Sequence, residues 1–209
     1  ALAVMPGSTV PIFMNRPMSK NSIYDSDAPL KSCMELKELG YDMKVIECDL
    51  EFLRSPIGFP SDLANAIPAL LLSQHLALDS IAFGTVLESA YGIGHEKFIE
   101  YKKGSHWRFY GKLFSCAGIE ICLPVAGISE VGTSLINYSS SYGEFAQSCI
   151  RGKWKKPCLK CWKCFRKELL SISLDSNKKI DLKEIMKASE VQIRLSAYPI
   201  SHENVIIYS

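Results

Sequence analysis

The feature that most constrains this sequence is a cluster of four cysteines in its last third. Cys149, Cys158, Cys161 and Cys164 fall within sixteen residues at the spacing Cys-x8-Cys-x2-Cys-x2-Cys. Four thiolates at such spacings suit a closed tetrahedral zinc site, because the two short spacers bring the last three sulfurs to one ion and the long spacer returns the chain as a loop. The cluster therefore predicts a structural zinc centre without an open coordination position, so catalysis would need other residues.

Other uses of these cysteines remain open. An iron–sulfur cluster, a redox pair of Cys161 and Cys164, or four unrelated thiols would fit the same spacing. The remaining cysteines stand among apolar neighbours, as reduced buried cysteines of a cytosolic protein do, and they are Cys33, Cys48, Cys116 and Cys122. We therefore expect a cytoplasmic protein, and a secreted disulfide framework is the less favoured reading.

The cysteines lie in a basic segment, residues 151–167, although the net charge of the whole chain is only +2. The segment holds no Asp or Glu and eight cations, which are Arg151, Lys153, Lys155, Lys156, Lys160, Lys163, Arg166 and Lys167. Such cations lower thiol pKa values and offset the negative charge of a zinc–tetrathiolate centre. Interleaved with Trp154, Trp162 and Phe165, they also suit phosphate contacts and base stacking, so a zinc-stabilised nucleic-acid-binding module is an alternative function.

Upstream of the cysteines, short apolar runs alternate with segments of helical periodicity. The runs at 8–14, 42–50, 79–85 and 118–128 predict strands, and 27–39, 62–78 and 95–116 predict helices. This alternation predicts an α/β fold, a Rossmann-like parallel sheet with helices on both faces. Ligands of such sheets bind beyond the carboxyl ends of the strands, here near Asn15, residues 84–88 and residues 124–130.

The organisation along the chain follows from these patterns. We expect an α/β nucleotide-binding domain over 1–147, a small zinc-binding subdomain over 148–167 and a C-terminal extension over 168–209. The extension should contain a helix around 182–189 and end on a β-strand, Val205–Ser209 (VIIYS). No apolar run reaches the roughly 20 residues of a membrane span, so no membrane contact is expected.

The pattern SC-x8-C-x2-C-x2-C-x-R, which ends at Arg166, resembles the zinc-binding end of the 7-cyano-7-deazaguanine synthases of the PP-loop, or N-type ATP pyrophosphatase, superfamily. DSIAFGTVLES (79–89) resembles the family strand with its glycine loop, and EICLPVAGISEVGTSLI (120–136) resembles the later strand, proline loop and helix. The similarity covers residues 1–167. It implies an adenine nucleotide alpha hydrolase-like fold, structural Zn2+, and ATP with Mg2+.

The resemblance implies a ligase-like activity of queuosine biosynthesis. Family members adenylate the carboxylate of 7-carboxy-7-deazaguanine, ammonia displaces AMP, and a second ATP-driven step dehydrates the amide to a nitrile. The candidate nucleotide or substrate residues here are Asn15, Arg16, Gly84, Thr85 and Glu88, the last of which could also hold Mg2+. Each also has a structural reading: Asn15 and Arg16 in an ordinary turn, and Gly84 as a backbone necessity. The resemblance also allows a homodimer.

Two departures separate this chain from the family pattern. The serine-glycine-glycine-x-aspartate-serine motif that holds the ATP pyrophosphate is absent from the 209 residues, and Ala1–Pro6 resembles the helix behind it. We therefore expect the first strand and its phosphate loop upstream of Ala1, and the chain alone to be inactive. Glu130 stands where the family commonly has lysine, and it would repel phosphate. A divergent relative within a larger protein, or a catalytically inactive scaffold of a bacterial defence system, would account for both.

Overall fold

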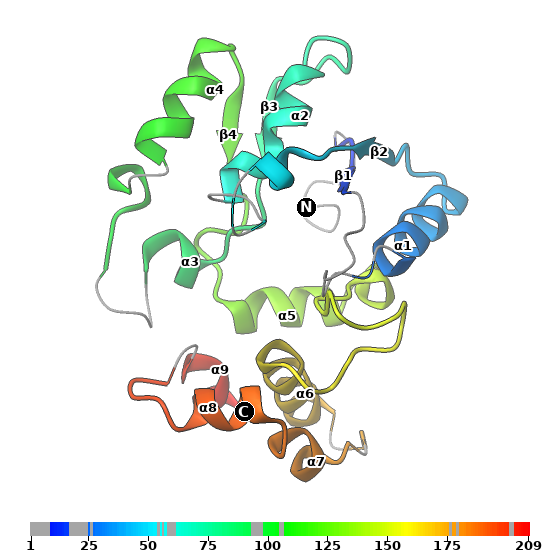
Figure 1. The fold of residues 1–209 in the computed structure, drawn as a ribbon, viewed down its shortest axis with the longest axis vertical. Coiled ribbons are helices and arrows are strands. Elements are labelled where there is room, and N and C mark those ends of the chain that lie inside the picture. The colour runs from blue at the N-terminus through cyan, green and yellow to red at the C-terminus, as the bar shows by residue number, and fades with distance from the viewer. Residues whose placement is uncertain are drawn as a thin grey trace.

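The computed structural model describes residues 9–16, 25, 27–53, 55, 57, 62–92, 98–104, 107–175, 177–178, 180–200 and 203–209. Within these ranges the strands form two parallel pairs. β1 (Ile12–Asn15) pairs with β2 (Lys44–Glu47), and β3 (Ser80–Ala82) pairs with β4 (Glu120–Cys122). The mixed α/β architecture with parallel strands is confirmed, but the described strands form two separate two-stranded sheets and not one continuous sheet (Figure 1).

The first pair is covered by α1 (Asp27–Glu38), which confirms the helix predicted over 27–39. Cys33 and Leu36 of α1 pack with Met43, and Phe13 and Val45 of the two strands contact this cluster. The helix is followed by Gly40 in the left-handed region, at φ +89°, where a residue with a Cβ would be strained. This glycine stop could therefore be predicted from the sequence.

The second pair packs against short helical pieces around the fully buried Phe114. The predicted helix 62–78 is wrong in length, because the chain forms a 3-10 turn (Asp62–Ala66), then α2 (Ile67–Leu71) with Pro68 in its first turn, then turns. The predicted helix 95–116 is likewise divided into a 3-10 turn (Tyr101–Lys103), a π-helical turn (Trp107–Gly111) and α4 (Lys112–Cys116). Residues 95–97 and 105–106 of that prediction, and Ala1–Pro6, lie outside the described residues.

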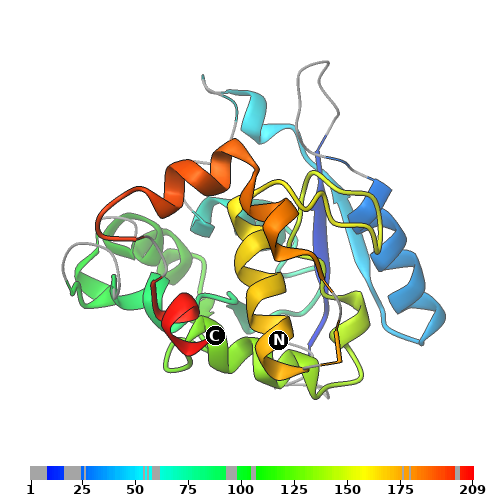
Figure 2. The same cartoon turned by 90° about the horizontal axis from the view of Figure 1, so that it is seen from below.

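The C-terminal part is a helical layer. α6 (Trp162–Leu174), α7 (Leu182–Met186), α8 (Ser189–Leu195) and α9 (Glu203–Tyr208) gather on one side of α5 (Glu130–Tyr138), away from the strands (Figures 1 and 2). The predicted terminal strand is therefore wrong: α9 forms there because Val205, 1% exposed, packs with Val131 and Leu170 on two other helices. Of the helices described, none has the length and apolar character to cross a membrane.

A buried carboxylate joins this layer to the strand-end loops. Glu88, on α3 (Leu87–Tyr91), is 4% exposed, accepts the backbone N–H of Glu130 at 2.9 Å, and accepts the side-chain amide of Asn204 on α9. Ser129 caps the same end of α5 by accepting the N–H of Gly132. Glu88 therefore satisfies donors from two helices in a buried position.

Glu88→Ala should lower the free energy of unfolding by about 1–3 kcal/mol, because it leaves the Glu130 N–H and the Asn204 amide without their acceptor. Urea titration followed by circular dichroism measures the change. Glu120→Ala is the matched control, since it removes an exposed carboxylate of β4. Equal stability of the two variants would contradict the structural role given to Glu88.

Candidate metal centre

The four clustered cysteines converge in space as their spacing predicts. The sulfurs of Cys149, Cys158, Cys161 and Cys164 all lie within 4.8 Å of one another, and all eight cysteines of the chain are free thiols. Tetrahedral coordination at a Zn–S distance of about 2.3 Å separates sulfurs by about 3.8 Å, and the sulfurs of Cys158 and Cys164 are 3.8 Å apart. This donor set could hold a metal ion such as zinc.

Backbone geometry fixes two of the sulfurs. The N–H of Cys158 donates to the sulfur of Cys149 at 3.3 Å, and the N–H of Cys164 donates to the sulfur of Cys161 at 3.4 Å. Cys161 is the N-cap of α6, so the cluster sits at the start of that helix. Between the ligands, Leu159 adopts φ +52°, which turns the chain tightly enough for Cys158 and Cys161 to face one centre.

The protonation of the thiols makes metal binding dependent on pH. Burial opposes ionisation of Cys149, but the N–H groups of Cys158 and Arg151 outweigh it and lower the pKa of Cys149 to about 7. Burial raises the pKa of Cys158 and of Cys164, so these two are protonated at neutral pH without a metal. A metal ion must displace those protons, and its affinity should therefore fall as the pH is lowered.

The eight-residue spacer is held by residues that the spacing argument did not identify. The side-chain amide of Gln147 donates to the carbonyls of Cys149 and Lys153 at 3.2 and 3.1 Å, and its oxygen accepts the N–H of Lys155 at 2.8 Å. Gly152 lies against the backbone across the loop, where a Cβ would come within 2.8 Å of the Cys158 nitrogen. The glycine inside the spacer could have indicated this close approach from the sequence alone. No feature of the sequence indicated the role of Gln147.

Two acidic residues from distant helices dock the loop. Glu35 of α1 accepts the indole N–H of Trp154 and the ammonium group of Lys155, the latter at 2.9 Å. Glu190 of α8 accepts the backbone N–H of Trp162 at 3.0 Å and pairs with Arg151 at 2.6 Å. The Trp162 N–H and then Arg151 lower the pKa of Glu190. The cysteine loop is thus anchored to both halves of the chain.

Glu130 has a different role from the one expected from the sequence resemblance. Its carboxylate pairs with the buried Arg166 and lies 3.5 Å from the ammonium group of Lys167, both on α6. Two cations face one carboxylate, so the negative charge that would repel a phosphate is compensated locally. The arginine two residues beyond the last cysteine therefore ties α6 to α5.

Two of the three aromatic residues of the basic segment are buried and therefore not available for stacking with bases. Trp162 and Phe165 are 6% and 4% exposed and stack on each other within the core of the helical layer. Trp154 is half-buried and bound to Glu35. This corrects the expectation that these three rings form a stacking platform.

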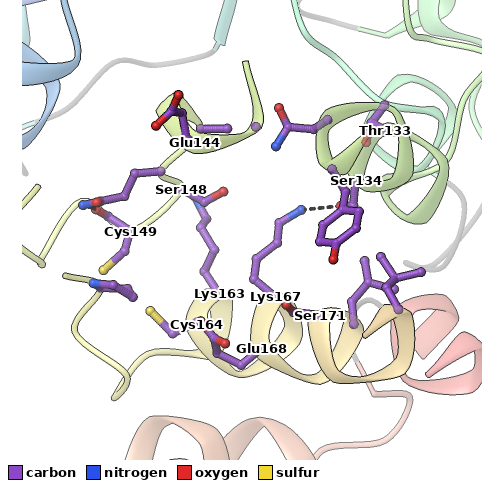
Figure 3. A pocket seen from close by; sticks show the side chains of 18 of the residues that line it. Thr133, Ser134, Glu144, Ser148, Cys149, Lys163, Cys164, Lys167, Glu168 and Ser171 are labelled. Carbon is purple, nitrogen blue, oxygen red and sulfur yellow. Dashed lines mark hydrogen bonds between the residues drawn. The ribbon is translucent and has the colours of Figure 1, made fainter. Parts of the chain in front are cut away.

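A cavity of about 690 Å3 borders the cysteine cluster between α5, α6 and the loop that joins them (Figure 3). Lys163 and Lys167 extend from α6 into it, and the ammonium group of Lys167 donates to the hydroxyl of Ser134 at 2.8 Å. Glu144 and Glu168, which also line it, pair with Lys155 and Lys178 at 3.7 and 3.5 Å. The sequence patterns did not predict this cavity.

The other predicted site residues do not converge on one described pocket. At the end of β1, the amide of Asn15 donates to Glu47 at 3.0 Å, and Arg16 pairs with Glu51. After β3, Gly84 is exposed, and a Cβ there would meet open space, so no steric reason requires glycine. Thr85 is half-buried in the same loop. Glu88 follows them but is bound to α5 and α9.

Cys161→Ser should reduce the metal content from about one zinc ion per chain to a small fraction, because three thiolates leave the tetrahedral site incomplete. Elemental analysis of the purified proteins measures this. Cys116→Ser is the control, since it removes an exposed cysteine outside the cluster. Iron with visible absorbance in the unmodified chain, or equal zinc in both variants, would overturn the assignment.

Gly152→Ala should weaken zinc binding by about 1–3 kcal/mol, because the added Cβ must push the backbone of residues 156–158 away from the cluster. Competition with a chromophoric chelator measures the affinity. Gly84→Ala adds the same methyl group in open space and should leave the affinity unchanged. Indistinguishable affinities would show that the spacer conformation does not control the site.

Comparison with known protein families gives a match over the C-terminal half. A family of unknown function, DUF6395, matches residues 109–209, which include α4, β4 and all elements from α5 to α9. Neither the curated proteins nor the solved structures contain a match to this chain. The matched region unites the cysteine cluster with the C-terminal helices, which agrees with their shared packing through Trp162 and Glu190.

Proposed function

We propose that this chain is part of an ATP-dependent ligase of the 7-cyano-7-deazaguanine synthase type, in which a structural zinc ion fixes the C-terminal layer to a nucleotide-binding sheet. The observation that carries the proposal is a groove of about 540 Å3 between the two strand pairs. Ile12 and Met14 of β1 and all three residues of β3 line it, together with Ala69 of α2. A groove between two parallel pairs is where a central strand of a Rossmann-like sheet would lie.

The edges of β1 and β3 that face the groove could pair with such a strand. The carbonyls of Pro11 and Asn15 accept hydrogen bonds from the β2 side, and the N–H of Phe83 donates to Cys122 on the β4 side. Because backbone groups alternate in direction along a parallel strand, those of Ile12 and Ala82 point to the opposite edge, toward the groove. The same holds for Met14 and Ser80, and none of these four residues hydrogen-bonds through that edge to another residue in the described ranges.

The size of the groove suits one strand. A residue in a packed sheet fills about 160 Å3, given a rise of about 3.3 Å, a strand spacing of about 4.8 Å and a layer thickness of about 10 Å. The groove of about 540 Å3 therefore holds about three residues, comparable to the four of β1 and the three of β3. We assign this strand to a segment of the encoded polypeptide upstream of Ala1 that also carries the phosphate loop.

This proposal assigns the residues at the ends of β1 and β3 to one ligand-binding site. Asn15 and Arg16 follow β1, and Gly84 and Thr85 follow β3, so these pairs end the two strands that flank the groove. Ligands of parallel sheets bind beyond such ends. ATP would convert the unreactive carboxylate of 7-carboxy-7-deazaguanine into an acyl adenylate with release of pyrophosphate, and ammonia would then displace AMP. Mg2+ would stabilise the leaving pyrophosphate.

The full-length product of the gene should release AMP and pyrophosphate from ATP when 7-carboxy-7-deazaguanine, ammonia and Mg2+ are supplied, and residues 1–209 alone should not. Coupled pyrophosphate detection and chromatography of AMP measure the reaction. The reason is that residues 1–209 contain no phosphate-loop motif. Absence of AMP release from the zinc-loaded full-length protein would overturn the proposed activity.

Hydrogen exchange separates the structural part of the proposal from the activity. The amides of Ile12, Met14, Ser80 and Ala82 should exchange slowly in the full-length protein and quickly in residues 1–209. The amide of Phe83, which is bonded to Cys122, should be protected in both and serves as the control. Equal exchange of the four amides in the two proteins would show that no strand enters the groove.

A further inference from the structure

We infer that the cysteine loop presents a basic surface that binds the phosphate backbone of nucleic acids. This interaction is independent of the proposed ligase activity. It rests on Lys153, Lys156, Lys160 and Lys163, which are all exposed. No acidic partner faces any of the four among the residues that the structure describes.

The other four cations of the segment are already in use. Arg151 pairs with Glu190, and Lys155 pairs with Glu35. Arg166 and Lys167 share Glu130. The basic run of the sequence therefore divides into four cations that form ion pairs and four exposed cations that form none with the described residues. Cations that only contact solvent would not need to be divided into a paired and an unpaired set. A surface that binds phosphate does need cations without carboxylate partners.

The cysteine cluster gathers these four lysines around one centre. Lys160 and Lys163 each precede a clustered cysteine directly, and Lys156 lies two residues before Cys158. Lys153 is bridged to Lys156 in an antiparallel pair, so their side chains lie on the same side of that hairpin. Since the four sulfurs lie within 4.8 Å of one another, the backbone next to Cys158, Cys161 and Cys164, which carries Lys156, Lys160 and Lys163, is held close to one centre.

The charge balance remains positive with a metal bound. A zinc ion with four thiolates carries two negative charges, and the four lysines exceed them by two. Of the carboxylates in the adjacent cavity, Glu168 pairs with Lys178. Glu144 shares Lys155 with Glu35, and the one negative charge left over there is offset by Arg166 and Lys167, which share the single carboxylate of Glu130. The surface thus attracts polyanions, and its recognition elements are ammonium groups suited to phosphates, without exposed aromatic rings to read bases.

Binding of a fluorescent single-stranded RNA of mixed sequence, and of a duplex DNA of equal length, tests the inference across a salt series. Four phosphate contacts give a slope of log K against log salt of about −2.8 for a single strand, so affinity should fall about 50-fold between 50 and 200 mM salt. Alanine at the four lysines should bring the slope close to zero. The two probes distinguish single-stranded RNA from duplex DNA as the preferred source of phosphate.

The matched control changes four exposed lysines elsewhere to alanine, and they are Lys31, Lys37, Lys112 and Lys183. It removes the same charge and should keep most of the affinity and slope. Both variants should retain the zinc content of the unmodified chain, which shows that the loop is intact. Equal loss in the two variants would indicate only a general charge effect, and undetectable binding by the unmodified chain at 50 mM salt would indicate a solvated face. Either result would overturn the inference.

Discussion

The convergence of four sulfurs at the start of α6 is the constraint on which the C-terminal half depends. The loop of residues 149–161 has almost no regular secondary structure, and its backbone direction is set by sulfur-directed N–H groups, by Gln147 and by the close approach at Gly152. Without a cation, neighbouring thiols with raised pKa values offer each other only weak contacts. A metal ion would replace these with four strong bonds and hold the first turn of α6 in place.

From the cysteine cluster, a continuous series of contacts leads to the strand ends. Cys164 and Arg166 lie on the first turns of α6, Arg166 pairs with Glu130, and the N–H of Glu130 donates to Glu88. Glu88 belongs to α3, which follows the loop after β3. Arg166 and Glu88 are buried and Glu130 is partly buried, and a buried ion pair is costly unless its partner is held rigidly. The rigid start of α6 meets that requirement.

The parts of this structure that could be predicted from sequence are those set by local spacing. The four-cysteine cluster, α1 with Gly40 and the parallel strands follow from periodicity and ligand spacing within short windows. The docking residues Glu35 and Glu190 could not be found in this way, because they lie 119 residues before Trp154 and 28 residues after Trp162. The end of the chain shows the same limit. VIIYS has strand propensity, but burial of Val205 against Val131 and Leu170 selects a helix.

The position of Glu130 shows how one charge can serve the fold and still leave a site open. From the sequence alone, the carboxylate of Glu130 is expected to oppose the binding of an anion near the end of β4. In the structure, two cations of α6 face it, and its backbone N–H donates to Glu88, so the start of α5 is occupied by protein groups.

A phosphate at the strand ends would then have to be held elsewhere. β1 and β3 both line the groove of about 540 Å3, and a loop after a strand placed there could supply the missing N–H donors. Anchoring of the C-terminal layer and binding of a nucleotide would thus use separate sets of groups, one organised by the cysteine cluster and the other by the central strand.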